Sequence, residues 1–207
     1  MQITYHGAEM IKIVSGQNTL IFNPVSKDAK LKNSKHSADV VFISAKSKYF
    51  TGLDNIRSKS EKFFVIDGPG EYEINSIFVK ATESKTEFDN ATLNTIYSVK
   101  AEDINFVFLG ALSDPKPNME FAEDLDSVDI LFVPIGSKGV LSPSEAHKIA
   151  VSLEAKIIIP IHYEGIEKKD ILDHFEKEFS GQFEKMEKLS IKKKDVQETG
   201  QRVVILS

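Results

Sequence analysis

The sequence predicts a single α/β domain over residues 1–207, in which two blocks of β-strands pack face to face with helices on their outer sides. Short apolar segments of strand length dominate the first two thirds of the chain, and strand and helix signals alternate in the last third. Several strand segments are apolar on both faces, which is typical of sheets covered on both sides. These observations favour a four-layer αββα sandwich. A doubly wound sheet is the competing arrangement, because the pattern does not fix the strand order.

The first two thirds of the chain consist of short strand signals separated by turn residues. Gly7 and the Ser-Gly-Gln-Asn sequence at residues 15–18 separate the first three strands, which predicts a hairpin-linked meander. The strands expected in this part of the chain are residues 3–5, 10–14, 19–22, 40–43, 63–66, 77–81, 95–99 and 106–109.

The last third contains two helix signals among further strands. A helix is predicted to begin at Pro143, because Ser142 can cap it and Glu145 completes a capping box. Apolar residues then recur at helical spacing, and a second segment repeats this pattern. The two apolar stripes are Ala146, Ile149, Ala150 and Leu153, and Ile171, Leu172, Phe175 and Phe179. The expected strands are residues 130–133, 156–161, 189–191 and 203–206.

Composition and charge exclude several function classes. The chain has no cysteine, which excludes disulfides, thiolate metal sites and a cysteine nucleophile. Its formal net charge is −5 and its only arginines are Arg57 and Arg202, so nucleic acid is not an expected partner. The one basic run, residues 192–194, predicts a solvated strand end. No apolar segment is long enough for a signal peptide or a spanning helix, so we expect a cytoplasmic protein without membrane association.

Segments spread over nearly the whole chain carry a family resemblance. Residues 3–7 (Ile-Thr-Tyr-His-Gly), 20–24 (Leu-Ile-Phe-Asn-Pro) and 38–44 (Ala-Asp-Val-Val-Phe-Ile-Ser) resemble three strands of the short metal-dependent hydrolases in the metallo-β-lactamase superfamily. These hydrolases are relatives of the ascorbate-phosphate lactonases. The three strands are the opening strand with its Gly turn, the Asp-Pro strand and the strand before the metal-binding loop.

The more specific matches lie in the second half of the chain. Residues 94–110 resemble a recurring hairpin of the family. Residues 128–136 (Val-Asp-Ile-Leu-Phe-Val-Pro-Ile-Gly) and 159–163 (Ile-Pro-Ile-His-Tyr) resemble its Val-Asp-Val-Leu-x-x-Pro-Val-Gly and Ile-Pro-Met-His-Tyr signatures. The order and spacing of these segments imply the αββα fold of that family.

The same resemblance implies that most of the family's metal ligands are missing. Active members carry a His-x-His-x-Asp-His loop, and only the glycine at its end, Gly52, is retained here. No histidine occurs near residues 83–85, where the family has its third-motif histidine. His162 is the only ligand position retained. The replaced positions correspond to Ala8, Asn23, Ala45, Ser47, Tyr49, Phe50 and Ala111.

The chemistry of the active family requires more than one histidine. A catalytic zinc ordinarily has three protein ligands and a water, and two-metal sites need several histidines and carboxylates. We therefore expect no dinuclear site and no cofactor. A mononuclear site built from His162 and two of the carboxylates Asp67, Asp114 and Glu164 is the alternative, because these groups lie near strand ends at the same edge. Zinc or manganese would be its metal.

The candidate ligand-binding residues are His162, Glu71, Asp114 and Ser47. His162 is expected to face the edge where the loops converge and to hydrogen-bond a polar group or water. Glu71 could face the old cleft as a general base, or it could belong to a tight turn whose glycines supply backbone freedom. We expect Phe50 to plug the space that the metals occupy in active members, because a dry interior favours an aromatic ring over unpaired polar groups.

Two function classes follow from these expectations. The first is a metal-free pseudoenzyme that binds a small molecule or a protein. The second is a metal-dependent hydrolase of a small ester, lactone or phosphate with an altered site. Metal content separates the two, and the fold alone does not decide between them.

Overall fold

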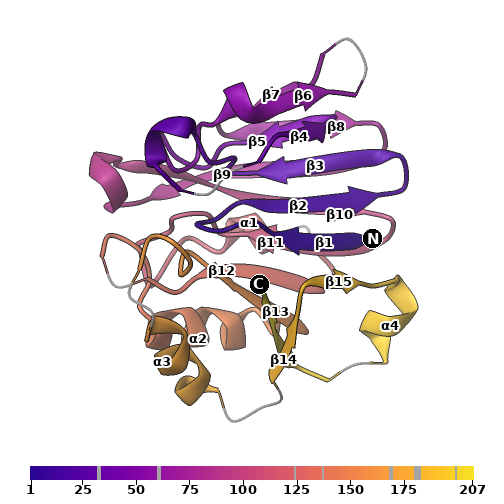
Figure 1. Cartoon of the computed structure of the whole chain (residues 1–207). Helices are drawn as coiled ribbons and strands as arrows, with labels where there is room; N and C mark the ends of the chain where they lie inside the picture. The colour runs from indigo at the N-terminus through magenta and orange to yellow at the C-terminus, as the bar shows by residue number, and fades with distance from the viewer. Residues whose placement is uncertain are drawn as a thin grey trace.

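Two β-sheets packed face to face form the centre of the molecule (Figure 1). The computed structural model describes residues 1–31, 34–59, 62–123, 125–136, 138–167, 170–179, 183–198 and 200–207. The inner faces of both sheets contribute to one apolar core, which includes Ile13, Phe22, Phe42, Phe106 and Phe132. The αββα sandwich predicted from the sequence is confirmed.

The first sheet combines an antiparallel meander with parallel strands. Within the described residues its order is β15-β1-β2-β3-β5-β7. Strands β3, β5 and β7 run parallel, so their carboxyl ends meet at one edge of the sheet. The strands are β1 (Gln2–Tyr5), β2 (Ile11–Ser15), β3 (Asn18–Phe22), β5 (Val40–Phe42), β7 (Phe64–Ile66) and β15 (Lys188–Ser190).

The second sheet follows the order β14-β16-β13-β12-β11-β10-β9-β8 among the described residues. Its strands β11, β12 and β13 are parallel, and β8, β9, β10 and β11 form an antiparallel meander. The strands are β8 (Gly70–Ile74), β9 (Ile77–Lys85), β10 (Leu93–Ala101), β11 (Ile104–Phe108), β12 (Ile130–Pro134), β13 (Ile157–Ile161), β14 (Phe183–Met186) and β16 (Arg202–Leu206).

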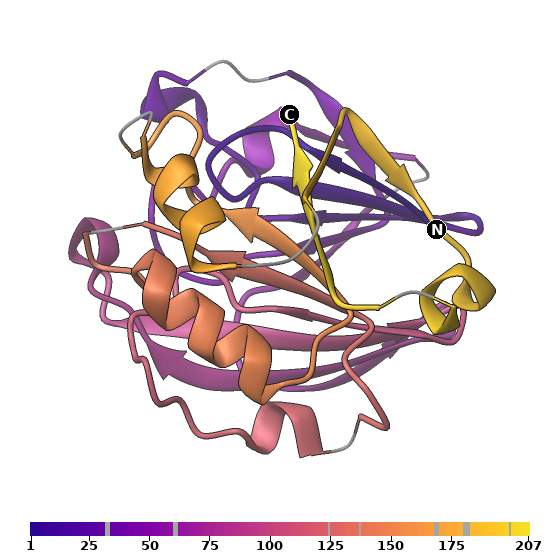
Figure 2. The ribbon, with the colours of Figure 1, turned by 90° about the horizontal axis from the view of Figure 1, so that it is seen from below.

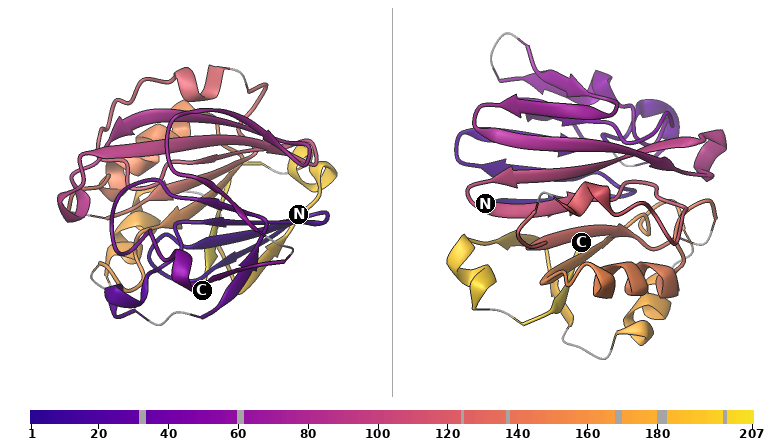
Figure 3. Two further views of the ribbon diagram at one scale, coloured as in Figure 1. Left: turned by 90° about the horizontal axis from the view of Figure 1, so that it is seen from above. Right: turned by 180° about the vertical axis from the view of Figure 1, so that it is seen from behind.

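Helices cover the outer face of the second sheet. Helices α2 (Pro143–Ser152) and α3 (Ile171–Glu178) lie side by side (Figure 2) and pack their apolar stripes against β11, β12 and β13. The short helix α1 (Glu120–Glu123) lies over β9 and β10 (Figure 3). None of the helices in the described ranges combines the length and apolar composition that crossing a membrane requires.

The outer face of the first sheet has a different cover. A two-stranded parallel sheet of β4 (His36–Ala38) and β6 (Ile56–Ser58) lies there with two short 3₁₀ helices, Lys27–Ala29 and Leu53–Asn55. These segments bury Ile21, Val41 and neighbouring apolar groups of the sheet in a second layer of core. Beside this cover, Tyr5 of β1 and residues of the turn that follows line a pocket.

Most of the predicted elements are present, and the differences have physical causes. The basic run at residues 192–194 does not end a strand but begins helix α4 (Lys193–Gln197). The Lys193 ammonium donates to the carboxylate of Asp129, which is fully buried, over 2.7 Å. Strands β4, β6, β8 and β14 have no counterpart among the expected strands, because they are short or half-exposed and lack a clear apolar alternation.

The start of α2 provides a direct test of the sequence pattern. The Ser142 hydroxyl accepts from the Glu145 backbone N–H, and the Glu145 carboxylate accepts from the Ser142 backbone N–H. Replacing Ser142 with Ala removes one partner of this box and should lower the free energy of unfolding by about 1 kcal/mol. Urea denaturation measures the loss. Ser144→Ala, in the first turn of the same helix, is the control and should change stability by less than about 0.5 kcal/mol; an equal loss in both variants would contradict the capping role.

Candidate functional site

Loops from both sheets meet at the edge formed by the carboxyl ends of the parallel strands. Asn23 follows β3 and Ser44 lies just beyond β5 in the first sheet. Ala111 lies beyond β11 and His162 directly follows β13 in the second sheet. In open α/β sheets this edge is the usual place for a ligand. The prediction that His162 faces this edge and hydrogen-bonds a polar group is confirmed.

A buried hydrogen-bond network surrounds His162. Its Nδ1 lies 2.5 Å from Oε1 of Glu9, and Oε2 of Glu9 accepts from the Asn23 amide over 2.6 Å. The Asn23 amide also donates to the Ser44 hydroxyl, and the Ser44 backbone N–H donates to Asn23 Oδ1, both over 2.8 Å. The side chains of Glu9 and His162 are fully buried. Both carboxylate oxygens of Glu9 are therefore hydrogen-bonded, as a charge in a dry interior requires.

The backbone at this network is strained. Ala8, Asn23 and His162 all have positive φ angles, of 53°, 45° and 67°, which cost non-glycine residues energy unless the surroundings hold them. The His162 N–H donates to the Ala8 carbonyl over 2.6 Å, and the Tyr5 hydroxyl donates to the same carbonyl over 2.8 Å. Burial raises the pKa of Tyr5 well above its usual value, so the hydroxyl keeps its proton at neutral pH.

Apolar side chains fill the space next to His162. Phe50 is fully buried in a cluster with Ala45, Ala111 and Val140. The ring of Phe88, from the loop between β9 and β10, packs on both aromatic groups: its centroid lies 5.5 Å from that of Phe50 and 4.5 Å from that of His162. The structure therefore places Phe50 as a plug, as expected from its position in the sequence.

Ser47 lies in the loop that carries Phe50. It is 5% exposed, and its hydroxyl donates to the Asp89 carboxylate over 2.7 Å and accepts from the Tyr49 backbone N–H. The loop that carries Ser47 ends at Gly52, which lies against the backbone of Val25. A Cβ atom on Gly52 would come within 2.1 Å of the Val25 carbonyl oxygen, so only glycine fits there. The hydroxyl of Ser47 thus holds the loop through Asp89 and Tyr49, and its role in ligand binding stays a prediction.

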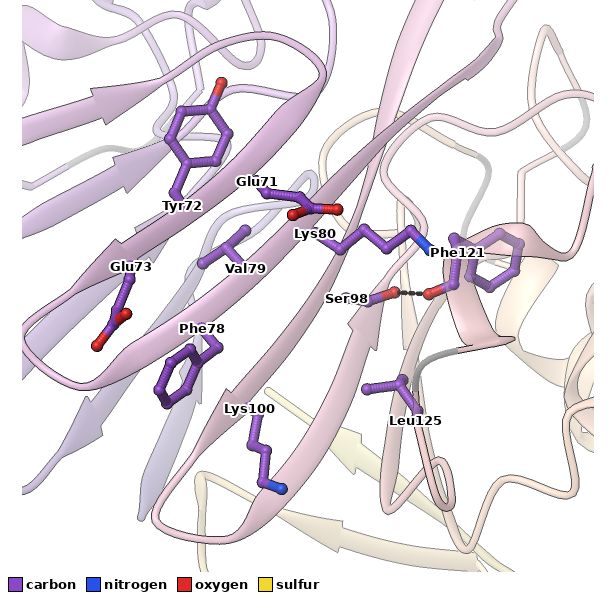
Figure 4. A pocket seen from close by; sticks show the side chains of 10 residues that line it. All are labelled: Glu71, Tyr72, Glu73, Phe78, Val79, Lys80, Ser98, Lys100, Phe121 and Leu125. Atoms are coloured by element: carbon purple, nitrogen blue, oxygen red, sulfur yellow. Dashed lines mark hydrogen bonds between the residues drawn. The ribbon is translucent and has the colours of Figure 1, made fainter.

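Among the described residues, neither the Glu71 nor the Asp114 carboxylate forms a hydrogen bond or ion pair with His162. Glu71 is an exposed residue of the edge strand β8, opposite Lys80 of β9, and lines a groove of about 570 Å³ on the outer face of the second sheet (Figure 4). The expected turn between two strands is present at residues 67–69, between β7 and β8, and Glu71 itself lies in β8. Asp114 lies on a loop at the sheet edge, where its carboxylate accepts from the Lys116 backbone N–H.

The residues present do not fit a hydrolytic metal centre. Apart from His162, the positions that match the family's ligands carry alanine, phenylalanine, tyrosine, serine or asparagine. The Nε2 atom of His162 is buried without a hydrogen-bond partner, which leaves one free nitrogen where a catalytic zinc needs three ligands. The described residues contain no group of three or more His, Asp or Glu side chains placed to hold an ion. His162 is therefore not grouped with Asp67, Asp114 or Glu164.

Glu9 is the site residue that sequence reasoning missed. It lies 153 positions from His162, in the turn between β1 and β2, where a carboxylate is normally solvated. The one available signal is its position between Ala8 and the apolar residues Met10 and Ile11. A charged residue just before a buried strand is a candidate for a buried hydrogen-bonded ion pair.

Two facing sheets, outer helices and a row of converging loops define a protein of the metallo-β-lactamase fold. The sequence profile of the β-lactamase superfamily domain matches residues 2–162, and the chain belongs to this superfamily. A protein of Listeria innocua, named a metal-dependent hydrolase, is 26% identical over 205 residues, covering 79% of this chain and 85% of the relative. A Geobacillus protein with the same kind of name is 24% identical over 196 residues, with the same coverage.

Solved structures agree with this assignment. A Thermotoga maritima protein, provisionally described as a Zn-dependent hydrolase of the metallo-β-lactamase superfamily, has a TM-score of 0.78 and 25% identity, covering 99% of this chain and 98% of its own. The metallo-β-lactamase fold protein YhfI of Bacillus subtilis has a TM-score of 0.65 and 11% identity, covering 100% and 95% of the two chains. The second likeness concerns the fold alone.

Truncation of the Phe50 side chain should strongly lower the stability of the fold. Because Phe50 is fully buried, Phe50→Ala should lower the free energy of unfolding by about 3–5 kcal/mol. Phe78, which is 50% exposed on β9, provides the matched control, and Phe78→Ala should cost about 1 kcal/mol or less. Denaturant-induced unfolding of the wild type, Phe50→Ala and Phe78→Ala measures both losses of stability. A loss of only about 0.5 kcal/mol for Phe50→Ala would mean that the cleft is open.

Glu9 and His162 should depend on each other for stability, because both side chains are buried and hydrogen-bonded to one another. His162→Leu leaves the Glu9 carboxylate buried with one donor and should cost about 3–5 kcal/mol. The double variant Glu9→Met/His162→Leu removes the stranded charge and should be more stable than His162→Leu alone. Both variants place leucine at the same positive φ, so the backbone strain cancels in the comparison. A double variant that is less stable than His162→Leu would contradict a desolvated pair.

Proposed function

We propose that this chain is a metal-free member of the superfamily, in which a protein interior has replaced the hydrolytic centre and which serves as a binding or interaction module. The burial of Phe50 carries the proposal. Metal-assisted hydrolysis needs a coordination position open to water and substrate. In this chain an aromatic ring and two alanines take up that space.

The groove on the outer face of the second sheet supports a binding role. It offers charged groups of both signs, Glu71, Glu73, Lys80 and Lys100, beside the half-exposed ring of Phe78 (Figure 4). Concave surfaces with a few polar groups around apolar side chains are typical of ligand sites. The partner we propose is a small molecule or a protein rather than nucleic acid, since the chain is acidic overall. The cytoplasmic location stays a prediction.

A metal-dependent hydrolase of a small ester, lactone or phosphate is the second candidate. The names of the Listeria and Geobacillus relatives support this candidate better than the first. The unpartnered Nε2 of His162 also supports it, because a buried nitrogen without a partner can accept an ion or a water. Zinc or manganese bound at His162 in a mononuclear site would be its cofactor. The composition of the cleft favours the first candidate.

Metal content distinguishes the two candidates. The protein is purified without added metal, analysed for transition elements, loaded with zinc or manganese, desalted and analysed again, in parallel with His162→Leu. We expect no bound metal that depends on His162, because the remaining cleft residues offer no further ligands. One or two tightly held ions per chain in the wild type that are lost in His162→Leu would instead establish the hydrolase candidate. Circular dichroism checks that the variant is folded.

A further inference from the structure

The edge strand β8 presents backbone groups that pair with no other strand. Among the described residues β8 is the last strand of the second sheet and pairs with β9 on one side only. Asn75 and Ser76, both at positive φ, form the two-residue turn between β8 and β9, as in a type I′ hairpin. The residue pair that flanks such a turn is hydrogen-bonded, and the alternation of the ladder then directs the N–H and C=O groups of Glu71 and Glu73 away from β9. No other strand or loop of the described chain bonds to these groups.

The side chains of β8 alternate between acidic and apolar. Glu71 and Glu73 face the outer groove (Figure 4). Tyr72 and Ile74 face the other way and pack, partly buried, against the core between the sheets. Because side chains of neighbouring strands share the same alternation, a strand added to β8 would place every second side chain beside a carboxylate and the others beside apolar groups.

Aromatic rings are exposed on the inner side of this edge. Strand β7 ends the first sheet at the same end of the molecule as β8 (Figure 1). Phe64 of β7 is 49% exposed, and its ring centroid lies 6.4 Å from that of Tyr72 in an edge-to-face arrangement. Large exposed apolar groups that lie together indicate an interaction surface. A strand added to β8 would cover both rings with its inward side chains.

Charge distinguishes between the strands that could add here. Antiparallel pairing of β8 with the same strand of a second copy would set glutamates of the two chains opposite each other, and like charges in that position are destabilising. Asp67, exposed in the turn before β8, adds a third carboxylate at this end. Lysine or arginine side chains opposite Glu71 and Glu73 would instead form favourable cross-strand pairs.

We propose that β8 binds an extended peptide segment of a partner protein, which adds antiparallel to the sheet as a further strand. Its alternate side chains are basic, beside Glu71 and Glu73, and apolar, against Tyr72 and Phe64. In this mode of recognition the main-chain hydrogen bonds supply affinity and the alternating side chains supply specificity. The inference rests on the proposed binding role and specifies the class of partner.

Fluorescence anisotropy tests the proposal with the labelled peptide Thr-Lys-Val-Lys-Val-Lys-Thr, titrated with the full chain in the presence of a metal chelator. We expect saturable binding. N-methylation of the lysine amides removes the N–H groups that face β8 and should weaken binding at least about tenfold, since two hydrogen bonds are lost. N-methylation of the valine amides, which face away from β8, is the matched control and should leave the affinity within about twofold.

A charge variant of the protein tests the side-chain pairing. Glu73→Lys should weaken binding of the unmodified peptide at least about fivefold, because it places like charges opposite each other. Glu73 lies opposite Phe78 on β9, so the change sets no like charge against its own hairpin partner. Glu178→Lys, at an exposed position of α3, makes the same change in net charge and should leave the affinity unaltered. Circular dichroism checks that both variants are folded.

Four results would overturn the proposal. They are no binding to the wild type, equal binding of the two methylated peptides, equal losses in Glu73→Lys and Glu178→Lys, and a wild-type dimer that the peptide dissociates, since a second copy would then occupy the edge. The methylated peptides need only the wild-type chain, so the test holds even if Glu73→Lys fails to fold. Metal bound at His162 would refute the metal-free role alone, because the titration contains a chelator.

Discussion

The hydrogen-bonded chain from His162 through Glu9 and Asn23 to Ser44 is the interaction on which the loop edge depends. It joins the loop after β13 of the second sheet to three loops of the first sheet. Buried polar groups stabilise a structure only when each has its partner, and such networks then fix one arrangement of the surrounding chain. Here side-chain hydrogen bonds make the connection across the same edge.

The residues at this edge bring little negative charge together. Bound cations allow several carboxylates to share a cleft, whereas carboxylates without cations repel each other and are costly to bury. Asn23 and Ala111 are neutral where the family resemblance implies aspartate, and one carboxylate, Glu9, lies buried with two donors. Asn23 keeps the shape of aspartate but supplies the N–H that Glu9 needs. This set of residues supports the proposed metal-free member of the superfamily.

Local patterns predicted much of the fold and the position of His162. The start of α2, the parallel strands and the buried Phe50 all follow from apolar spacing, capping residues or matched motifs. The features that were missed depend on partners distant in sequence. Glu9 is buried only because His162 and Asn23 reach it, and Glu71 faces the outer groove because β8 pairs with β9 in a register that sequence does not specify.

The backbone at the edge keeps a strained conformation although metal ligands are missing. Ala8, Asn23 and His162 remain at positive φ, a conformation that costs energy at each position unless packing and hydrogen bonds hold it. The bond from the His162 N–H to the Ala8 carbonyl and the side-chain network supply this support within the chain. These bonds hold the loops to one another within the chain. The groove around Glu71 lies on the outer face of the second sheet, and it is the surface that the proposed binding role would use.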